Sequence, residues 1–271
     1  MPPGNRPSDP RTGGYDRPVP PLTGRSAIVT GASRRAGIGF AIARRLGEHG
    51  TQLLVQSWQA HDRAHPWGAD PGGIDAVLEE LGGPHHVELD LAEADAPARL
   101  LAEASERLGH VDILVANHAR SGHGAIGELT ADELDAFWAV NVRSTLLLVQ
   151  EFAERHDGRP GGRVVMMTSG QHRGAMAPEV GYAVTKGAIH QATATLSDAL
   201  ADRGITVNTV NPGPTDTGWP TPELRERMLE LMPFGRWGEP DDAARLVAWL
   251  CTDDARWITS QVIDSEGGFR R

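Results

Sequence analysis

The sequence is short of cysteine, of basic residues and of long apolar segments. Its single cysteine, Cys251, cannot form an internal disulfide, and the surrounding pattern AARLVAWLCTDDA predicts a small buried side chain on a helix. No segment reaches the roughly 20 consecutive apolar residues that a spanning helix requires, so we expect a cytoplasmic protein with no membrane partner. Acidic residues outnumber basic ones by 36 to 26, and the net charge of −10 repels phosphate backbones. We therefore expect no nucleic-acid partner, and we predict no metal site.

The N-terminal segment, residues 1–22, is rich in Pro, Gly, Arg and Asp and has no apolar core typical of a secretory signal. Such a composition buries too little apolar surface to offset the entropy lost on ordering, so the segment is predicted to be a disordered leader. Of the two tyrosines, Tyr15 lies in this leader. Tyr182 is therefore the one phenol expected in the folded domain, residues 23–271.

Strand-like and helix-like patterns alternate from residue 25 onward. Short apolar runs predict buried strands at 27–30, 52–56, 86–89, 113–116, 164–168, 206–210 and 261–264. Most of the segments between them have apolar residues at helical spacing. Parallel strands need crossover connections, so this alternation predicts a single doubly wound α/β domain with helices on both faces of a largely parallel sheet.

Two insertions interrupt the alternation, and each follows the end of a strand. Residues 59–73 form a long polar loop, and residues 215–237 contain a short helix rich in Met and Leu. Ligands of open α/β sheets bind beyond the carboxyl ends of the strands, so both insertions are candidate walls of a site. In the second insertion, Trp219, Met228 and Met232 either cover a hydrophobic substrate or seal the helix onto the core.

A glycine-rich turn, TGASRRAGIG at residues 30–39, follows the first strand and opens the first helix. Gly31, Gly37 and Gly39 allow close approach of a pyrophosphate to the backbone, and the helix N-terminus supplies free N–H groups. Turns of this kind also arise for purely steric reasons. Its place at the first strand-to-helix connection favours nucleotide binding.

Four polar side chains form a candidate catalytic set. Tyr182 and Lys186 lie four residues apart, on one face of a predicted helix. A phenol has a pKa near 10, and a neighbouring ammonium, together with an oxidised nicotinamide, would lower it toward neutrality. Ser169 ends a predicted strand, where its hydroxyl can donate to a substrate carbonyl oxygen. Asn141 lies in the middle of a predicted helix, where an asparagine usually has a specific reason. Taken alone, the Tyr–Lys pair is also compatible with ordinary helix packing.

From about residue 25 to residue 269 the sequence resembles the short-chain dehydrogenase/reductase family. TGASRRAGIG resembles its TGxxxGxG motif, YAVTK matches its YxxxK, and Ser169 has the family's spacing to the tyrosine. NVRS at Asn141, NPGPTDT at 211–217 and Asp90 in ELDL match further family segments. The resemblance implies a Rossmann-type sheet of seven parallel strands in the order 3-2-1-4-5-6-7, and a homotetramer or dimer.

The resemblance also implies roles for these residues. Tyr182 would be the general acid/base, Lys186 would lower its pKa and hold the nicotinamide ribose, and Ser169 would orient the substrate oxygen. Asn141 would anchor a water that relays protons through Lys186. The cofactor-binding residues it implies, together with those expected from the glycine-rich turn and the end of the second strand, are Gly31, Ser33, Arg34, Arg35, Gly37, Ile38, Gly39, Ser57, Trp58, Asp90, Leu91, Asn117, Tyr182, Lys186, Pro212, Gly213, Thr215 and Thr217.

Two positions depart from the family pattern. Five residues separate Gly31 from Gly37 where the family usually has three, which leaves open which N–H groups meet the pyrophosphate. The usual NNAG reads Ala-Asn-His-Ala, so His118 stands where the family has a small residue. This histidine either contacts the cofactor or substrate, or packs and bonds locally.

The second predicted strand ends in Gln56-Ser57-Trp58, without the acidic residue that would accept the ribose 2′-hydroxyl of NAD. Arg34 and Arg35 bring positive charge to the neighbouring turn, and a guanidinium is well suited to bind phosphate. We therefore expect NADP(H) rather than NAD(H), with one of the two arginines on the 2′-phosphate.

The expected function is hydride transfer between NADP(H) and a carbonyl or alcohol on a small-molecule or thioester-linked substrate, as in 3-oxoacyl thioester reductases. One alternative is a non-redox epimerase or dehydratase on the same scaffold. Another is an NADP-sensing regulator, which has no need of Tyr182 and Lys186. Enoyl reduction is disfavoured because that branch of the family typically spaces the tyrosine and lysine farther apart.

Overall fold

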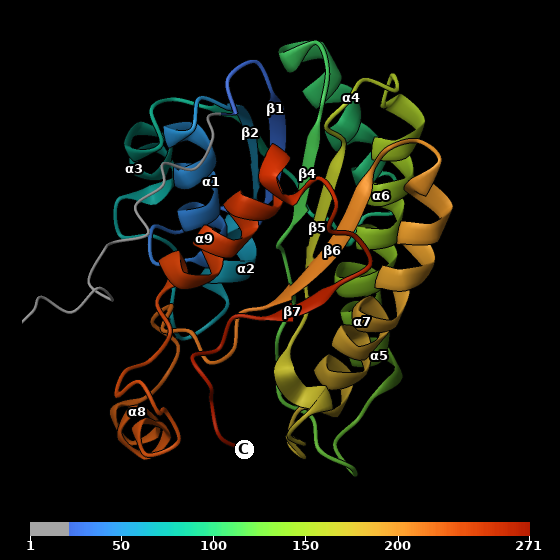
Figure 1. Ribbon diagram of the computed structural model, residues 1–271. Coiled ribbons are helices and arrows are strands. Elements are labelled where there is room, and N and C mark those ends of the chain that lie inside the picture. The colour runs from blue at the N-terminus through green and yellow to red at the C-terminus, as the bar shows by residue number, and fades with distance from the viewer. Residues whose placement is uncertain (1–21) are drawn as a thin grey trace, which may run out of the picture.

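A computed structural model describes residues 22–271 and places seven parallel strands in one sheet (Figure 1). Their order is β3-β2-β1-β4-β5-β6-β7, so the predicted doubly wound fold is confirmed. The strands are β1 (Ser26–Thr30), β2 (Gln52–Ser57), β3 (His85–Glu88), β4 (Ile113–Ala116), β5 (Arg163–Met167), β6 (Thr206–Asn211) and β7 (Val262–Asp264).

The predicted leader, residues 1–22, falls almost entirely outside the described residues. Its last member, Leu22, is described, and it is buried in the core with its N–H bonded to the carbonyl of His49. Leu22 therefore packs with the domain expected at 23–271.

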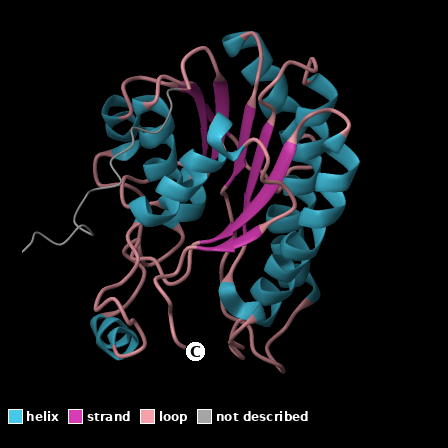
Figure 2. Cartoon of the chain, viewed as in Figure 1, coloured by secondary structure: helices cyan, strands magenta, loops and turns pink. Residues whose placement is uncertain are grey.

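Helices cover both faces of the sheet (Figure 2). One face carries α1 (Ile38–Glu48), α3 (Gly73–Glu80) and α9 (Pro240–Leu250). The other carries α4 (Ala96–Leu108), α6 (Ser144–Arg155) and α7 (Val180–Ala201). Shorter elements complete the chain: α2 (Gln59–Arg63), α5 (Ala131–Phe137), η2 (Trp138–Arg143), η3 (Gly170–His172), α8 (Pro222–Leu229) and η4 (Asp253–Ala255). None of the helices within residues 22–271 is long and apolar enough to cross a bilayer.

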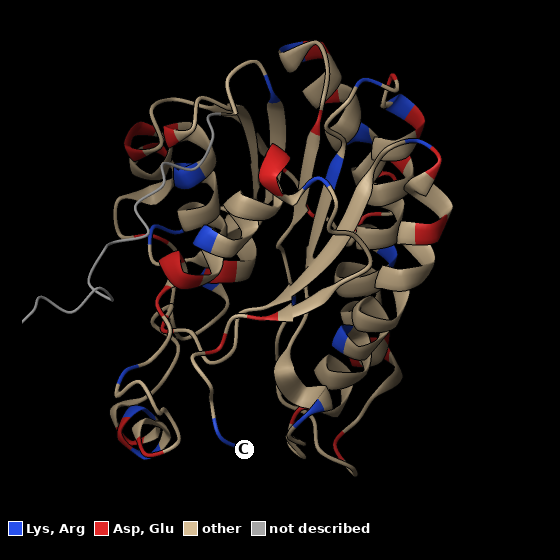
Figure 3. Cartoon of the chain, viewed as in Figure 1, with Lys and Arg blue, Asp and Glu red and all other residues tan. Residues whose placement is uncertain are grey.

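Strand side chains divide between two apolar cores because successive residues of a strand point to opposite faces. Val29, Val55 and Val115 pack beneath α1 and α9. Their neighbours Ile28 and Leu54 pack beneath α4 and α6. Charged residues lie mostly on helices and loops, as Figure 3 shows. Burial on both faces explains why the strands read as continuous apolar runs in the sequence.

All seven strands end at the same edge of the sheet, which we call the carboxyl edge. The loops that follow β5 and β6, helix α8 and the chain's C-terminus gather at this edge, in the lower part of Figure 1. Both insertions predicted as walls of a site follow strands that end there.

Candidate active site

Helix α7 carries the predicted tyrosine–lysine pair. Lys186 is 4% exposed, and its Nζ donates to the carbonyl oxygen of Met167 at 3.0 Å, at the end of β5. The same Nζ lies 5.7 Å from the centroid of the half-buried Tyr182 ring. The i, i+4 spacing thus brings both side chains to one face of the helix, as expected.

Burial shifts the pKa values of both groups. It lowers the pKa of Lys186 to about 8, because the interior disfavours the charged amine. It raises the pKa of Tyr182, and the nearby carboxylate of Glu179 raises it further. The protein by itself therefore raises the pKa of the phenol, which is opposite to the lowering expected from the sequence. The amine of Lys186 is bonded to a backbone carbonyl and not to the phenol. A neutral phenol is the form that donates a proton.

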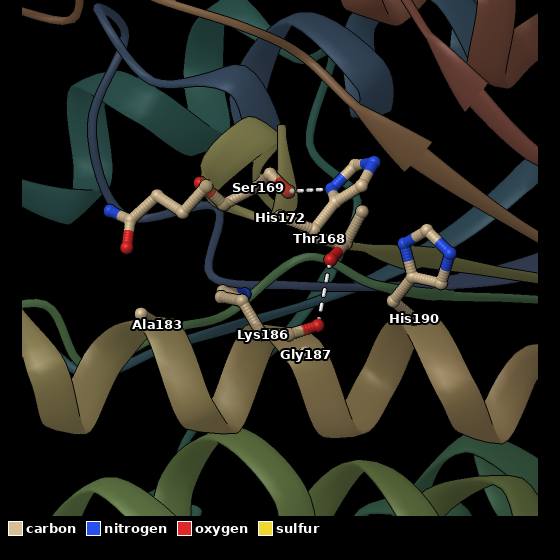
Figure 4. Close-up of a pocket in the computed structure, with 8 residues that line it drawn as sticks. Thr168, Ser169, His172, Ala183, Lys186, Gly187 and His190 are labelled. Carbon is tan, nitrogen blue, oxygen red and sulfur yellow. Dashed lines mark hydrogen bonds between the residues drawn. The ribbon is translucent and has the colours of Figure 1, made fainter. Parts of the chain in front are cut away.

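Ser169 and Lys186 line one cavity of about 170 Å³ between α7 and the loop after β5 (Figure 4). No hydrogen bond joins the hydroxyl of Ser169 or of Tyr182 to another of residues 22–271. Thr168, which precedes Ser169, instead donates from Oγ1 to the carbonyl of Lys186 at 2.8 Å. Of the two hydroxyls that directly follow β5, the one at Ser169 remains available to a ligand.

Two histidines in this cavity are not among the predicted site residues. The rings of His172 and His190 meet edge to face, 4.5 Å between centroids. His172 donates from Nδ1 to the carbonyl of Ser169 at 3.2 Å, and Nδ1 of His190 is buried with no partner within residues 22–271. Their positions in the sequence could have indicated them: His172 lies three residues after Ser169, and His190 lies four residues after Lys186.

Asn141 lies in η2, a six-residue π-helical segment, and its side chain is 1% exposed. Its Oδ1 accepts from the N–H of Arg120 at 2.7 Å, and its Nδ2 donates to the carbonyl of Arg120 and to Oγ1 of Thr185, both at 2.9 Å. Thr185 in turn donates to the carbonyl of Tyr182 at 2.8 Å. The asparagine in mid-helix is thus explained: it ties the loop after β4 to the turn that carries Tyr182.

His118 is buried and hydrogen-bonded at both ring nitrogens. Nδ1 lies 2.7 Å from Oγ1 of Thr30, and Nε2 lies 3.0 Å from the carbonyl of Val140 and 2.7 Å from Oγ of Ser144. The carbonyl accepts only, so Nε2 carries the hydrogen and the Thr30 hydroxyl donates to Nδ1. Burial lowers the pKa of His118 to about 3, with a further contribution from the charge of Lys186, so the ring is neutral. Of the two possibilities that the sequence left open for His118, these contacts match the local one: the ring joins Thr30 to Val140 and Ser144.

The glycines of the turn after β1 are required by the protein's own packing. Gly31 has φ +69°, and a Cβ added there would lie 2.8 Å from Cα of His118. A Cβ on Gly39 would lie 2.4 Å from the carbonyl oxygen of Gly31. Asn117, expected to bind cofactor, donates from Nδ2 to the carbonyls of Thr30 and Gly31 at 3.0 and 3.2 Å and so holds the turn in place.

The N-terminus of α1 suits the pyrophosphate of a dinucleotide. Gly37 is its N-cap, no side chain caps it, and its first turn, which begins at Ile38, holds no acidic residue. The first N–H groups of a helix have no partner within it, and together with the helix dipole they favour an anion. The predicted nucleotide turn and this helix end therefore fit the group expected there.

The two arginines of the turn each pair with a carboxylate. Nε of Arg34 lies 3.4 Å from Oδ1 of Asp62, and Arg35 pairs with Asp70 at 2.7 Å. Both acidic residues belong to the insertion 59–73, which folds back on the turn and is not an open loop. Both arginines expected near the cofactor are therefore already paired with carboxylates, and the sequence does not indicate these pairs because the partners are distant along the chain.

The remaining residues of the expected cofactor set lie near the carboxyl edge, and most are engaged locally. Ser57 bonds to His86 at 2.8 Å, and Trp58 is 37% exposed. Asp90 accepts from the N–H of Ala92 at 2.8 Å, and Leu91 is buried.

In the loop after β6, Thr215 donates to the carbonyl of Pro212 at 3.1 Å. A Cβ on Gly213, which has φ +63°, would lie 2.4 Å from Cβ of Glu266. The carbonyl of Thr217 accepts from Arg34 at 3.1 Å. This loop therefore reaches the glycine-rich turn across the carboxyl edge.

The expected substrate lid, residues 215–237, is partly packed. Trp219 donates to the carbonyl of Thr215 at 2.9 Å and meets Trp237 edge to face at 5.8 Å. Met232 is 6% exposed, which matches the alternative that it seals this segment onto the core, whereas Met228 stays partly exposed on α8. No residue of α8 is buried, and Arg225 links the helix to its surroundings: its carbonyl accepts from Trp237 and its guanidinium pairs with Asp216.

Comparison with known proteins agrees with this geometry. The family model described as enoyl-(acyl carrier protein) reductase matches residues 31–270. The oxidoreductase YjdA of Bacillus subtilis is 42% identical over 251 residues, which cover 90% of this chain and 96% of that protein. The chain belongs to the short-chain dehydrogenase/reductase family.

Solved structures of short-chain dehydrogenases/reductases show the same architecture. One from Serratia marcescens is 33% identical and superposes with a TM-score of 0.79, covering 92% of this chain and 99% of that one. The angucycline C-6 ketoreductase LanV, solved with bound NADP, is 36% identical with a TM-score of 0.80, covering 92% and 96%. The expected family and sheet order are both confirmed.

Proposed function

We propose that this protein transfers hydride between NADP(H) and a carbonyl or alcohol, with Tyr182 as the proton-transferring residue. The observation that carries the proposal is the arrangement at the end of β5. Lys186 is anchored on the carbonyl of Met167 beside the Tyr182 ring, and it shares a cavity with Ser169. A general acid, a cation and a hydroxyl donor are the groups that carbonyl reduction requires.

Each residue has a distinct part in the proposed reaction. Ser169 donates its free hydroxyl to the substrate oxygen and holds it near the phenol. Tyr182, neutral at physiological pH, donates its proton to that oxygen as the carbonyl is reduced. Lys186 keeps two N–H donors beyond its bond to Met167, enough to hold the hydroxyls of a ribose. Asn141 positions Tyr182 through Thr185. Bound NADPH supplies the hydride.

Three observations support NADP(H) as the cofactor. The uncapped N-terminus of α1 suits the pyrophosphate that NADP(H) shares with NAD(H). β2 ends at Ser57 without an acidic side chain that would select a free ribose hydroxyl. The related ketoreductase LanV was solved with NADP.

We propose carbonyl rather than enoyl reduction, although the matching family model is described as an enoyl reductase. Tyr182 and Lys186 are four residues apart, and the resemblance to YxxxK members associates that spacing with carbonyl chemistry. The substrate class we propose is a ketone or aldehyde, free or thioester-linked. Exposed apolar side chains at Leu134, Trp138 and Val184, on α5, η2 and α7, support association into a dimer or tetramer.

The test follows NADPH absorbance with a panel of ketones, aldehydes, 3-oxoacyl thioesters and enoyl thioesters. We expect oxidation of NADPH with at least one carbonyl substrate and none with the enoyl thioesters. In Tyr182→Phe, turnover should fall at least about a thousandfold, because the acid that protonates the oxygen is removed, whereas NADPH binding measured by fluorescence should change less than about threefold.

Two outcomes would contradict the proposal. Full activity of Tyr182→Phe would remove the phenol from the mechanism. Substrate conversion with no change in NADPH absorbance would instead indicate an epimerase or dehydratase.

A further inference from the structure

Asp62 is an acidic side chain in the interior of the expected cofactor site. It lies on α2, in the insertion after β2, and is 6% exposed. Three donors surround its carboxylate: Oγ of Ser33 at 2.5 Å, Nε1 of Trp67 at 3.3 Å and Nε of Arg34 at 3.4 Å. Together these donors, a hydroxyl, an indole N–H and a guanidinium, form an anion-binding site. The carboxylate of Asp62 occupies this site.

Two of these donors belong to the turn that was expected to bind the cofactor. Ser33 and Arg34 lie between β1 and α1, and Gly31 of the same turn donates its N–H to the side chain of Gln56 at 3.0 Å, so the turn abuts the end of β2. In a dinucleotide-binding fold the adenosine ribose lies beyond the end of the second strand. The donors that Asp62 occupies are therefore the ones that a 2′-phosphate on that ribose would need.

Arg34 is fixed by more than Asp62. Its NH2 group donates to the carbonyl of Thr217, in the loop after β6, at 3.1 Å. Its guanidinium lies 5.7 Å from the centroid of the Trp67 ring, and its side chain is 14% exposed. A guanidinium held in this way is already oriented for an anion, and the anion next to it is the carboxylate of Asp62.

We propose that Asp62 is a specificity-determining residue for the cofactor: its carboxylate occupies Ser33 and Arg34 in place of the 2′-phosphate of NADP(H), which has to displace it. The inference rests on the proposed function, in that it takes NADP(H) as the cofactor. Carboxylate and phosphate repel each other strongly at short range, so they do not share these donors in a partly buried site. Asp62 therefore weakens the binding of NADP(H) relative to NAD(H), which has no 2′-phosphate.

The neighbouring pair of Arg35 and Asp70 is the matched control. It also joins an arginine of the turn to an aspartate of the insertion. Asp70, however, accepts from the backbone N–H groups of Arg35 and Gly72 at 2.9 and 3.0 Å, so it shapes the loop, and the Arg35 side chain is 37% exposed. Replacing Asp70 removes the same charge without opening the Ser33–Arg34 site.

The experiment is an equilibrium titration of the full-length chain with NADPH and with NADH, followed by fluorescence. In Asp62→Asn, we expect the Kd for NADPH to fall at least about tenfold and that for NADH to change less than about twofold, because like-charge repulsion is removed only for the phosphate. Asp70→Asn should change both values less than about twofold. Trp67→Phe removes one donor to Asp62 and leaves its charge, and it should tighten NADPH binding about threefold. It serves as a second variant in case Asp62→Asn folds poorly.

The possible results separate the inference from the function on which it rests. If the wild type binds NADPH and neither Asp62→Asn nor Trp67→Phe binds it more tightly, the inference is wrong and the proposed function stands. If Asp62→Asn loses affinity for NADH instead, Asp62 holds the ribose hydroxyls, and both the inference and the proposed cofactor are overturned. If the wild type binds neither nucleotide, the proposed function itself fails.

Discussion

At one end of the carboxyl edge, the hydroxyls of Ser169 and Tyr182 have no hydrogen-bond partner within residues 22–271. At the other end, Ser33 and Arg34 are bonded to Asp62. We call these the catalytic end and the adenosine end, after the roles proposed for them above. The catalytic end is arranged for a ligand in advance, so binding there requires little rearrangement of protein bonds. The adenosine end satisfies its own polar groups, and a ligand has to exchange bonds with them.

The difference follows from where the polar groups come from. Ser169 and Tyr182 project from a strand end and a long helix, whose backbones are held by the two apolar cores. Ser33 and Arg34 lie in a turn, and the nearby insertion carries acidic side chains that reach them. The elements that carry Ser169 and Tyr182 place no polar group in bonding range of these hydroxyls, whereas the insertion after β2 places Asp62 and Asp70 beside the turn.

Alanine variants of Ser169 and Ser33, one serine from each end, test the difference between the two ends most directly. Ser169→Ala should lower kcat by about a thousandfold, equivalent to about 4 kcal/mol, because the substrate oxygen loses a donor. Its free energy of unfolding should change by less than about 0.5 kcal/mol, since no protein hydrogen bond is lost. Ser33→Ala should instead lower the free energy of unfolding by about 1.5 kcal/mol, because its bond to a carboxylate is removed. Urea unfolding and steady-state kinetics measure both effects. A large stability loss in Ser169→Ala would contradict the contrast between the two ends.

A second prediction concerns how the catalytic end is held. Asn141→Ala should lower the free energy of unfolding by about 3 kcal/mol, because the backbone N–H and carbonyl of Arg120 lose their side-chain partner and the Thr185 hydroxyl loses one of its two bonds. Its kcat should fall as well, because the turn with Tyr182 loses a support. Asn208→Ala is the control. Asn208 is also 1% exposed and bonds to Ile258 and Gln261, so it should lose similar stability but keep kcat. Equal kcat in the two variants would show that Asn141 has a purely structural role.

The third prediction is a pH dependence at His118, which joins the two ends through Thr30 and Val140. The unfolded chain protonates this histidine below pH 6.5, whereas burial holds its pKa at about 3 in the fold. Stability is therefore complete above pH 6.5 and is lost as the pH falls, by about 1.4 kcal/mol per pH unit, or about 2 kcal/mol at pH 5. Urea unfolding at pH 7 and pH 5 should show a loss about 2 kcal/mol smaller in His118→Gln than in the wild type. Equal losses would mean that His118 is not buried in its neutral form.

The sequence predicted the elements that depend on local pattern. The strands were located within one or two residues at each end, because continuous apolar runs reflect burial on both faces. Tyr182 and Lys186 were placed on one helix face because four residues make about one turn. The bonds of Arg34 to Asp62 and of His118 to Val140 escaped prediction, since they join residues 22 or more positions apart through loops with no periodic pattern. The π-helical segment around Asn141 was also missed, although its unusual asparagine was noticed.

The close packing at Gly31 and Gly39 bears on how such sequences should be compared. Their hydrogen atoms face the backbone of His118 and of the turn itself, at distances that exclude any larger side chain. A descendant of this chain that had stopped using nucleotides would still be selected to keep both glycines, simply in order to fold. Conservation of these two glycines therefore reports on folding and not on cofactor binding. Loss of cofactor binding would appear first as changes at Tyr182, Lys186 and the free N-terminus of α1.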